Sequence, residues 1–347
     1  MRKLASVQRV YAIEPIEGAD RIELAHVLGW QCVVNKGKFK PGDLGIYFEV
    51  DSFLPVEPLF EFLRAQSYRN SNLMGEGFKL RTMRFKGQIS QGLLLPLSDF
   101  PQLPEDLQLG ADLTETLHVR KWEIEERATT SGTILGTLPA SIPHTDETRI
   151  QAEPDLLGDF VDLEYYITTK MDGSSHSVSL DDGDFHVTGH NYEYKDDGTN
   201  SFYELVKGMG LEERMRDYVA AHGLNSLTLQ GELCAPGIQQ NKLKLFKPEW
   251  YVFTVYENGK RKGLQFMQDL CRELELQMVP LEEVGKGLAD KYPDVDSLLK
   301  RADGQYPKGG PKEGIVIRPT EPVYSDRLSA SLSFKVINNK YLLNQKD

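Results

Sequence analysis

Long hydrophobic runs are absent from this chain of 347 residues. No apolar stretch approaches the ~20 residues that are needed to cross a bilayer. The first six residues, Met-Arg-Lys-Leu-Ala-Ser, include no apolar segment long enough for a secretory signal peptide. The sequence therefore predicts a protein without membrane attachment that works inside the cell, in the cytoplasm.

Cysteine is scarce. The three cysteines, Cys32, Cys234 and Cys271, are an odd number and lie far apart. No Cys-x-x-Cys or His-Glu-x-x-His pattern occurs, which argues against a structural zinc site. This usage excludes a disulfide framework and fits a reducing compartment.

An excess of basic residues is also lacking. Lysine and arginine number 40 against 52 acidic residues, which gives a formal charge of −12. This balance argues against a protein that binds nucleic acid by general electrostatic attraction, but it leaves room for local basic tracks. The length favours two domains of ordinary size, and we expect a monomer.

The first domain is predicted over residues 1–120. Short strand candidates at 7–13, 22–34 and 44–50 are separated by turns, a pattern typical of a small β-barrel. The segments Ile-Glu-Gly-Ala-Asp-Arg-Ile-Glu at 16–23 and Lys-Pro-Gly-Asp at 40–43 resemble the OB fold that is appended to some tRNA synthetases and RNA ligases.

Basic and aromatic side chains on one face of such a barrel bind nucleic acid. Two interpretations stay open for them here: a binding track, or a solvated face above core aromatics. The candidates are Lys36, Lys38, Lys40, Lys79, Arg81, Arg84 and Lys86, with Phe39, Phe78 and Phe85 between them.

Residues 121–148 are predicted to be a linker, because they begin with charged residues and continue through a Thr-, Ser-, Gly- and Pro-rich segment. The second domain is predicted over 149–347. Its strand candidates end at 169, 193, 234, 256, 318 and 337, and its helix candidates cover 202–218 and 264–277.

Lys170 ends an apolar, β-branched run and is followed by a turn-forming Asp172-Gly173. A lysine is nucleophilic only when it is neutral, and only about one in two thousand is neutral at pH 7. A nucleophilic lysine therefore needs desolvation or a nearby cation. Asp172 is placed to help hold such a cation. The four residues Lys-Met-Asp-Gly at 170–173 alone, however, also fit a simple hairpin turn.

Further charged residues stand beside apolar strands, where a packed sheet does not need them: Glu232, Glu313 and Lys335. Together with Asp172, the two glutamates can hold a hydrated divalent cation. Lys170, Lys335 and Arg149 can neutralise phosphates. The pattern predicts a nucleoside triphosphate site, although no Gly-x-x-x-x-Gly-Lys loop is present.

The order of these motifs resembles that of the covalent nucleotidyltransferases, which comprise DNA ligases, RNA ligases and mRNA-capping enzymes. The motifs are Lys-Met-Asp-Gly at 170–173, Gly-Glu-Leu at 231–233, Tyr-Val-Phe at 251–253, Glu-Gly-Ile-Val-Ile-Arg at 313–318 and Phe-Lys at 334–335. The segments 231–243 and 146–151 resemble RNA ligases in particular. Because 12 residues follow Lys335, we expect no C-terminal OB domain of the kind that DNA ligases and capping enzymes carry.

The resemblance implies an α+β fold: an N-terminal OB-type barrel, then an ATP-grasp-like nucleotidyltransferase domain of antiparallel sheets with flanking helices. It also implies an ATP-dependent RNA ligase with Mg²⁺ or Mn²⁺. Such an enzyme joins 3′-OH and 5′-phosphate RNA ends, especially nicks in duplexes. It does so through AMP linked covalently to Lys170 and then an adenylylated RNA 5′ end.

The resemblance assigns roles to the candidate residues. Asp172, Glu232 and Glu313 would hold the metal through water, and Glu313 and Lys335 would assist Lys170 in catalysis. Nucleotide contacts would come from Arg149, Thr169, Lys170, Gly173, His190, Glu232, Phe253 and Lys335, with Phe253 stacked on adenine. For Arg149, the γ-phosphate and the RNA end remain alternatives.

Two positions depart from the family pattern. His190 stands where an arginine is usual, and Ser333 stands where the first of two lysines is common. Roles in RNA binding or as solvated surface stay open for Lys242, Lys244 and Lys247. A guanylyltransferase of the capping type and a non-catalytic RNA- or tRNA-binding protein are the competing functions.

Overall fold

The computed structural model describes residues 2–104, 106–123 and 132–344. The chain divides into two compact units. The first comprises residues 1–125, 151–154 and 342–347, and the second comprises 126–150 and 155–341. Within the predicted linker, residues 124–131 lie outside the described residues, whereas 134–137 form a strand of the second unit. No helix in the described ranges is long and apolar enough to span a membrane.

The first unit is built on a five-stranded antiparallel sheet with the order β10-β4-β1-β2-β3. The long strand β1 changes register between Val10 and Ala12, which lets it pair β4 along its first half and β2 along its second. The predicted strands at 7–13, 22–34 and 44–50 correspond to β1–β4. The bounds are β1 (Ala5–Pro15), β2 (Ile22–Val27), β3 (Trp30–Asn35), β4 (Leu44–Phe48) and β10 (Leu93–Pro96).

A second sheet of this unit has the order β11-β5-β7-β6, and a β8–β9 hairpin stands beside β3. Phe39 and Phe78 are buried core residues, so these two aromatics of the proposed track are packing residues. The basic side chains around them are exposed, except Lys79, which is half-buried. The bounds are β5 (Ser52–Leu54), η1 (Pro58–Leu63), α1 (Arg64–Ser67), β6 (Tyr68–Ser71), β7 (Gly75–Lys79), β8 (Met83–Phe85), β9 (Gln88–Ser90), η2 (Leu97–Asp99) and β11 (Arg120–Lys121).

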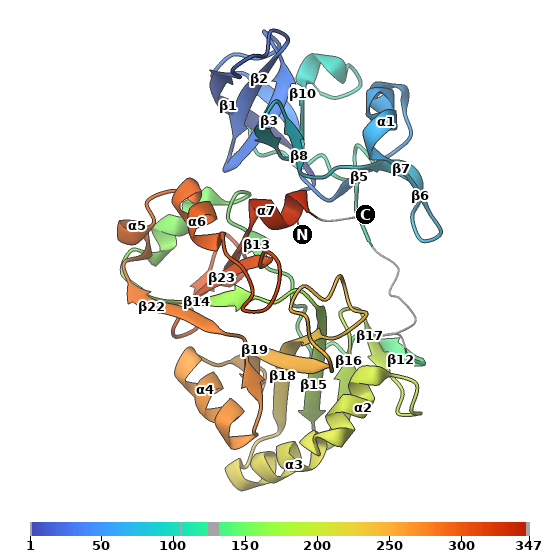
Figure 1. The fold of residues 1–347 in the computed structure, drawn as a ribbon, viewed down its shortest axis with the longest axis vertical. Coiled ribbons are helices and arrows are strands. Elements are labelled where there is room, and N and C mark those ends of the chain that lie inside the picture. Colours follow the sequence, from blue (N-terminus) through green and yellow to red (C-terminus); the bar gives the residue numbers. More distant parts are fainter. Residues whose placement is uncertain (1, 105, 124–131, 345–347) are drawn as a thin grey trace. The chain divides into compact units, whose positions relative to one another are not determined.

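The second unit contains a large sheet with the order β12-β17-β16-β15-β18-β19-β20, and β21 also pairs with β19. Alternate residues of β15 and β18 face a core formed with α2, α3 and α4, which cover one face of the sheet (Figure 1). The strand bounds are β12 (Ile134–Thr137), β15 (Ser174–Asp181), β16 (Asp184–Thr188), β17 (Tyr192–Tyr194), β18 (Ser226–Cys234), β19 (Glu249–Glu257), β20 (Lys260–Arg261) and β21 (Gln277–Met278).

The helix predicted at 202–218 is two helices, α2 (Ser201–Gly208) and α3 (Leu211–His222). Gly210 between them has a φ of +61°, a left-handed conformation that ends one helix and lets the chain start the next. The helix predicted at 264–277 is α4 (Leu264–Glu273), and Gln277 instead begins the short strand β21. Each prediction gave the right type of element but extended it through a break.

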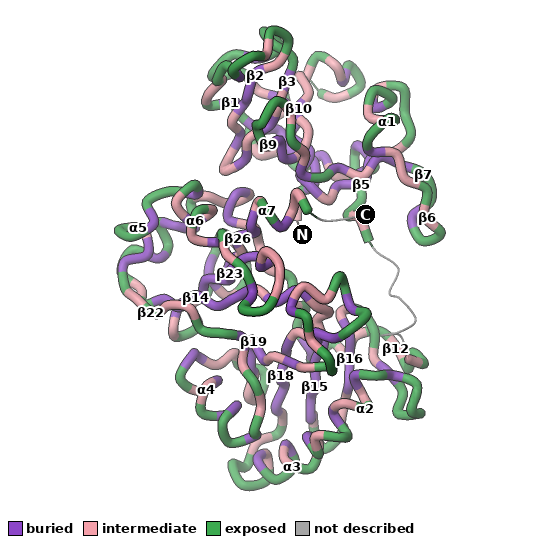
Figure 2. Tube along the Cα trace, in the orientation of Figure 1, coloured by how far each residue is buried: buried purple, intermediate pink, exposed green. Residues whose placement is uncertain are grey.

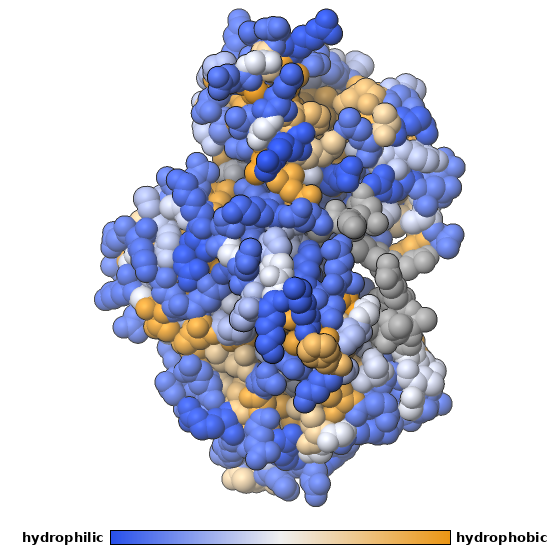
Figure 3. All heavy atoms as spheres, in the orientation of Figure 1, coloured by the Kyte–Doolittle hydropathy of each residue, from blue (hydrophilic) through white to orange (hydrophobic). Residues whose placement is uncertain are grey.

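A smaller sheet of the second unit has the order β13-β26-β23-β14-β22. Its central strands β14 and β23 are buried (Figure 2) and pack with η3, α5 and α6 into a separate core. Figure 3 shows hydrophobic surface along the edge strand β22, where Leu281 and Val284 are exposed. The bounds are β13 (Thr148–Arg149), η3 (Pro154–Phe160), β14 (Glu164–Lys170), β22 (Leu281–Lys286), α5 (Leu288–Lys291), α6 (Val295–Ala302), β23 (Gly314–Pro319), β24 (Tyr324–Ser325), β25 (Ala330–Ser331), β26 (Phe334–Ile337) and α7 (Asn339–Leu343).

The two sheets of the second unit are joined directly at residues 171–173, which connect the end of β14 to the start of β15. The ends of both sheets therefore converge where Lys170 stands. The sequence predicted strands that each carry one charged residue near an end. In the structure these charged residues lie at this junction. The arrangement of sheets with flanking helices confirms the predicted α+β class.

Candidate active site

Lys170 is the last residue of β14, a strand of aromatic and β-branched residues that is buried between β22 and β23. Its Cα pairs in register with that of Gly314 on β23. A Cβ atom at position 314 would lie 2.1 Å from the carbonyl oxygen of Val336, so only glycine fits there. Lys170 is thus held on a rigid strand rather than on a loop.

Glu313 precedes Gly314 and forms an ion pair with Lys170, with 2.9 Å between Nζ and Oε2. Both side chains are largely shielded, with 22% and 17% of their surface exposed. The two residues are far apart in the chain, and the antiparallel pairing of β14 with β23 brings them together.

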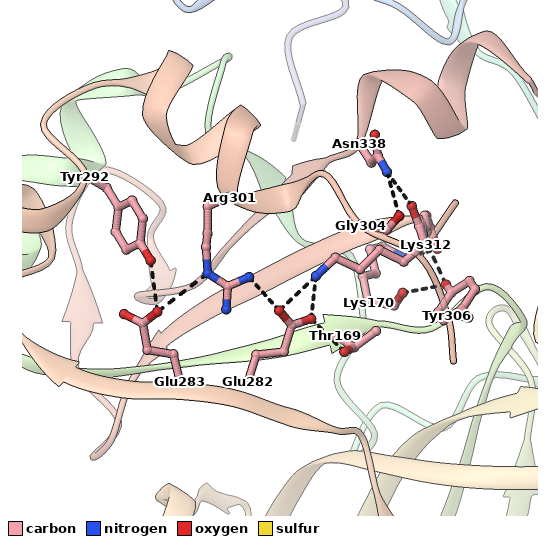
Figure 4. A network of polar contacts seen from close by, with 11 residues as sticks. Thr169, Lys170, Glu282, Glu283, Tyr292, Arg301, Gly304, Tyr306, Lys312 and Asn338 are labelled. Carbon is pink, nitrogen blue, oxygen red and sulfur yellow. Dashed lines mark hydrogen bonds and ion pairs between the residues drawn. The ribbon is translucent and has the colours of Figure 1, made fainter. Parts of the chain in front are cut away.

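Tyr306 fixes the main chain around this ion pair (Figure 4). Its hydroxyl donates to the carbonyl oxygen of Lys170 at 2.8 Å and accepts from the amide of Glu313 at 3.1 Å. The ring is buried beside Met171 and Leu243. A single side chain therefore ties the two strand ends that present the lysine and the carboxylate.

Glu232 reaches the same junction from β18. Its carboxylate accepts a hydrogen bond of 3.0 Å from the amide of Gly173. A Cβ atom at position 173 would lie 2.3 Å from the carbonyl oxygen of Leu233, so glycine is required where the turn passes over β18. The Asp-Gly turn is packed against the strand that carries Glu232.

Asp172 is buried, with 4% of its surface exposed. Tyr341 of α7 donates its hydroxyl proton to Oδ1 at 2.7 Å. Lys242 places its amine 3.7 Å from Oδ2 and 3.5 Å from the centre of the Tyr341 ring. Asp172 is held from one side by α7 and from the other by the loop between β18 and β19.

These carboxylates govern the charge of Lys170. Burial alone would lower the pKa of Lys170, but the charges of Glu313, Glu232 and Asp172 together raise it. Burial raises the pKa of Glu232 to about 8, against the opposing effect of Lys170. Burial and the charge of Glu313 also raise the pKa of Asp172. Three acids around one amine thus keep the amine protonated unless another cation offsets them.

The donor set fits a hydrated divalent cation rather than one bound directly by a cluster of side chains. Among the described residues, no group of three His, Cys, Asp or Glu side chains is arranged to ligate a metal directly. However, Oδ2 of Asp172 is buried without a hydrogen bond. Carboxylate oxygens are the ligands that Mg²⁺ and Mn²⁺ prefer, and Mg²⁺ commonly keeps several of its waters.

A pocket of about 180 Å³ opens from Lys170 between the two sheets of the second unit. Of the predicted site residues, six line it: Thr169, Lys170, His190, Glu232, Phe253 and Lys335. The pocket wall also includes Val279, Val316 and Met171, so an apolar surface stands beside the charged end. Such a pocket suits a ligand with a flat apolar part and an anionic part.

Arg318 supports the wall of this pocket through three contacts. Its guanidinium donates to Oε1 of Glu147 at 2.6 Å and to the carbonyl oxygen of Phe253, and Nε donates to the hydroxyl of Ser333 at 3.1 Å. Arg318 and Ser333 are themselves buried. Arg318 therefore holds the pocket wall together, and Ser333, at the position of a common family lysine, is one of its acceptors.

The remaining predicted residues differ in position. Lys335 on β26 pairs in register with Arg149 on β13, and Lys335 lines the pocket whereas Arg149 is not part of its lining. His190 lies 3.6 Å from Asp146 and 3.5 Å from the hydroxyl of Thr145. Thr169 donates its hydroxyl proton to Glu282 at 2.7 Å.

A partly buried ion network lies beside the strand that carries Lys170 (Figure 4). Lys312 donates to both oxygens of Glu282 at 2.6 and 2.8 Å, and Arg301 donates to the same carboxylate at 2.6 Å. Because Glu282 also accepts from Thr169 and Lys312 precedes Glu313, the network joins the residues adjacent to both members of the Lys170–Glu313 pair.

Sequence reasoning missed Tyr306, Tyr341 and the Glu282 network. No local signal marks the two tyrosines, since Tyr306 lies 136 positions from Lys170 and Tyr341 lies 169 positions from Asp172. The glutamates Glu282 and Glu283 stood beside a weak strand pattern and gave no signal of burial. Glu147 had a partial signal, because it lies in the Asp-Glu-Thr-Arg segment that resembles RNA ligases.

Sequence comparisons agree with this geometry. Residues 163–337, just over half of the chain, match the family profile described as RNA ligase, and residues 4–97 match an OB-fold domain. A search of curated protein sequences found no match. The chain belongs to the RNA ligase family, which confirms both the predicted resemblance and the predicted OB-type first module.

Solved structures of the Naegleria gruberi RNA ligase are similar over nearly the whole chain. The structure with PPi is 33% identical, with a TM-score of 0.87, over 99% of this chain and 98% of that one. A lysine-to-alanine variant with ATP and Mn is 32% identical, with a TM-score of 0.88, over 98% of both chains. A glutamate-to-alanine variant with AMP and Mn is 33% identical, with a TM-score of 0.88, over 98% of both chains.

Proposed function

We propose that this RNA ligase uses ATP and Mg²⁺ or Mn²⁺ to join 3′-OH and 5′-phosphate RNA ends, in nicked duplexes, through AMP linked to Lys170. The observation that carries the proposal is the pocket that ends at Lys170, with Phe253 on its wall and Glu313 paired to the amine. The binding of ATP, AMP and Mn by the similar Naegleria enzyme supports the choice of nucleotide and metal.

In the first step, the Lys170 amine attacks the α-phosphorus of ATP after losing a proton. A nitrogen–phosphorus bond forms, the bond between the α-phosphorus and the bridging oxygen breaks, and pyrophosphate leaves. A divalent cation held through water by Asp172, Glu232 and Glu313 would supply charge that lowers the pKa of Lys170 and stabilises the transferring phosphate. The ion pair with Glu313 keeps the amine directed at one point, which favours in-line attack.

The nucleotide would lie along the pocket. Phe253 stacks on adenine, His190 faces the ribose, and Thr169, whose hydroxyl is bound to Glu282, contributes to the pocket wall beside the nucleotide. Lys335 contacts the α-phosphate, and Gly173 allows the close approach of the Asp-Gly turn to β18. Arg149, which pairs in register with Lys335 at the adjacent strand, contacts the γ-phosphate or the RNA end.

In the second step, a 5′-phosphate oxygen of RNA attacks the AMP phosphorus and frees the Lys170 amine. In the third step, the neighbouring 3′-OH attacks the adenylylated 5′-phosphate, a phosphodiester forms and AMP leaves. Residues 1–120 would contribute to RNA binding through their exposed basic side chains, such as Lys36, Lys38, Arg81 and Arg84.

The test is incubation with α-labelled ATP and Mg²⁺ or Mn²⁺, followed by denaturing electrophoresis. We expect label on the wild-type protein and none on Lys170→Ala, whereas Lys291→Ala, which changes an exposed lysine of α5, should label normally. Label that persists in Lys170→Ala would refute the assignment of the nucleophile.

Substrate choice needs two further comparisons. Labelling by GTP in preference to ATP would favour a guanylyltransferase, and folded protein that takes no label from either nucleotide would favour a non-catalytic RNA-binding protein. Joining should be measured with an RNA nick and with separate single strands of the same sequence. Equal joining of both would contradict the proposed preference for nicks.

A further inference from the structure

The loop between β18 and β19, residues 235–248, carries an unusual aromatic side chain. Phe246 has 96% of its surface exposed, and the next most exposed large hydrophobic side chain in the described part of the chain is Tyr324, at 66%. A phenylalanine held almost wholly in water gains nothing from packing in the folded protein. A single exposed hydrophobic side chain does not by itself indicate a binding site. The residues around Phe246 determine whether it does.

The base of this loop is held firmly. Asn241 and Leu245 exchange two hydrogen bonds of 2.9 Å, one in each direction between the Asn241 side chain and the Leu245 main chain. Leu243 is buried with Met171, and the carbonyl oxygen of Lys242 accepts from the amide of Gly310. The chain leaves this anchored base at Leu245, so Phe246 projects from a fixed point.

The same loop contacts the residues that follow Lys170. Gln239 donates its side-chain amide to the carbonyl oxygen of Gly173 at 3.3 Å, and Lys242 lies 3.7 Å from Asp172. The loop that presents Phe246 is therefore attached to the turn beside the proposed nucleophile. The base of the loop therefore lies next to the place where an RNA end would meet Lys170.

Lysines flank the aromatic ring on both sides in the sequence. Lys244 and Lys247 are both exposed, and residues 244–248 contain no acidic side chain. In a chain with a formal charge of −12, such a local group of cations favours contact with an anionic partner. An exposed aromatic ring between lysines is the combination with which proteins bind unpaired nucleotides, by stacking on a base and neutralising the adjacent phosphates.

We propose that Phe246 stacks on a base of the RNA strand at the junction to be sealed, while Lys244 and Lys247 contact the flanking phosphates. This inference rests on the proposed function, because it places RNA at Lys170. Stacking tolerates any base, which suits an enzyme that must accept ends of varied sequence. The firmly held loop base lets the ring align the end without the loop having to be ordered first.

The test compares Phe246→Ala and Phe246→Trp in the full chain, with Tyr324→Ala as the matched control for loss of an exposed aromatic side chain elsewhere in the second unit. Each variant is assayed for labelling by α-labelled ATP, for joining of a nicked RNA duplex, and for quenching of 2-aminopurine placed at the nick. Stacking of a base on an aromatic side chain is worth enough to expect about a tenfold rise in the RNA concentration for half-maximal joining in Phe246→Ala.

Phe246→Ala should label with AMP at the wild-type rate and lose the quenching, and Phe246→Trp should restore both joining and quenching. The double variant Lys244→Ala/Lys247→Ala should reduce the slope of log K for RNA binding against log salt concentration by about two, because two phosphate contacts are lost. Wild-type quenching and joining by Phe246→Ala would overturn the inference and leave the proposed function intact. Loss of AMP labelling in the wild type itself would instead refute the proposed function.

Discussion

The hydroxyl of Tyr306 lies 2.8 Å from the carbonyl oxygen of Lys170, and the same hydroxyl accepts the amide of Glu313. The distance between the proposed nucleophile and its carboxylate partner is therefore set partly by a third residue that need not touch ATP. The Tyr306 side chain is buried and both hydrogen bonds are partly buried, so water replaces them poorly if the hydroxyl is removed.

Tyr306→Phe should slow lysine adenylylation about tenfold while leaving the protein folded, because it frees two main-chain groups that position Lys170 and Glu313. Single-turnover labelling with saturating ATP measures the rate. Tyr292→Phe is the matched control, since Tyr292 also donates its hydroxyl to a partly buried acceptor, Glu283, but away from Lys170. Equal slowing of both variants would indicate a general loss of stability instead.

Arg318→Lys should raise the ATP concentration needed for half-maximal adenylylation about tenfold, with a smaller change in the maximal rate. A single ammonium cannot replace the three directed contacts of Arg318 with Glu147, Phe253 and Ser333. ATP titration of the labelling rate separates the two effects. Arg327→Lys, at an exposed ion pair of the same unit, should behave as the wild type. An unchanged ATP dependence in Arg318→Lys would show that Arg318 does not shape the nucleotide site.

Lys312→Met should lower the free energy of unfolding by about 3 kcal/mol, because it leaves the carboxylate of Glu282 without its best-buried cation. The Lys312 side chain is only 8% exposed, and it makes two hydrogen bonds to Glu282. Urea denaturation measures the change. Lys291→Ala removes an ion pair whose lysine is exposed, and Glu283 keeps its contacts with Tyr292 and Arg301, so the variant should cost less than about 1 kcal/mol. Similar losses in both variants would contradict the importance of burial.

His176 should make the protein less stable in acid. Burial lowers the pKa of His176 from 6.5 to about 4, and its ring lies against Phe202 and Tyr194. Below pH 6.5 the unfolded chain binds a proton that the folded protein does not, so this contribution is complete above pH 6.5 and declines toward pH 4. The decline should reach about 3 kcal/mol at pH 4.

Urea denaturation at pH 7 and pH 4.5 tests this. His176→Gln should lose that part of the pH dependence, while His222→Gln, which changes an exposed residue of α3, should keep it. If the pH dependence of His176→Gln equals that of the wild type, other groups are responsible for the acid sensitivity.

The order of the short sequence motifs was sufficient to predict the fold class and the family. Lys170, Glu232 and Glu313 lie at or near the ends of apolar strands, because each strand must pack while a charged residue near its end faces the site, and this combination is visible in the sequence. The α+β class, the OB-type module and the RNA ligase family follow from such local patterns. Helix limits were less well predicted, since Gly210 interrupts a continuous apolar pattern.

Only the tertiary structure decided which side chains hold these motifs in place. Tyr306 lies 136 positions from Lys170 and Tyr341 lies 169 positions from Asp172, yet each makes one of the defining hydrogen bonds of the site. A tyrosine carries no sign in the sequence of the carbonyl or carboxylate to which it will donate. The partner is fixed by strand pairing and by the packing of α7 and the loop at Tyr306, which are properties of the folded chain.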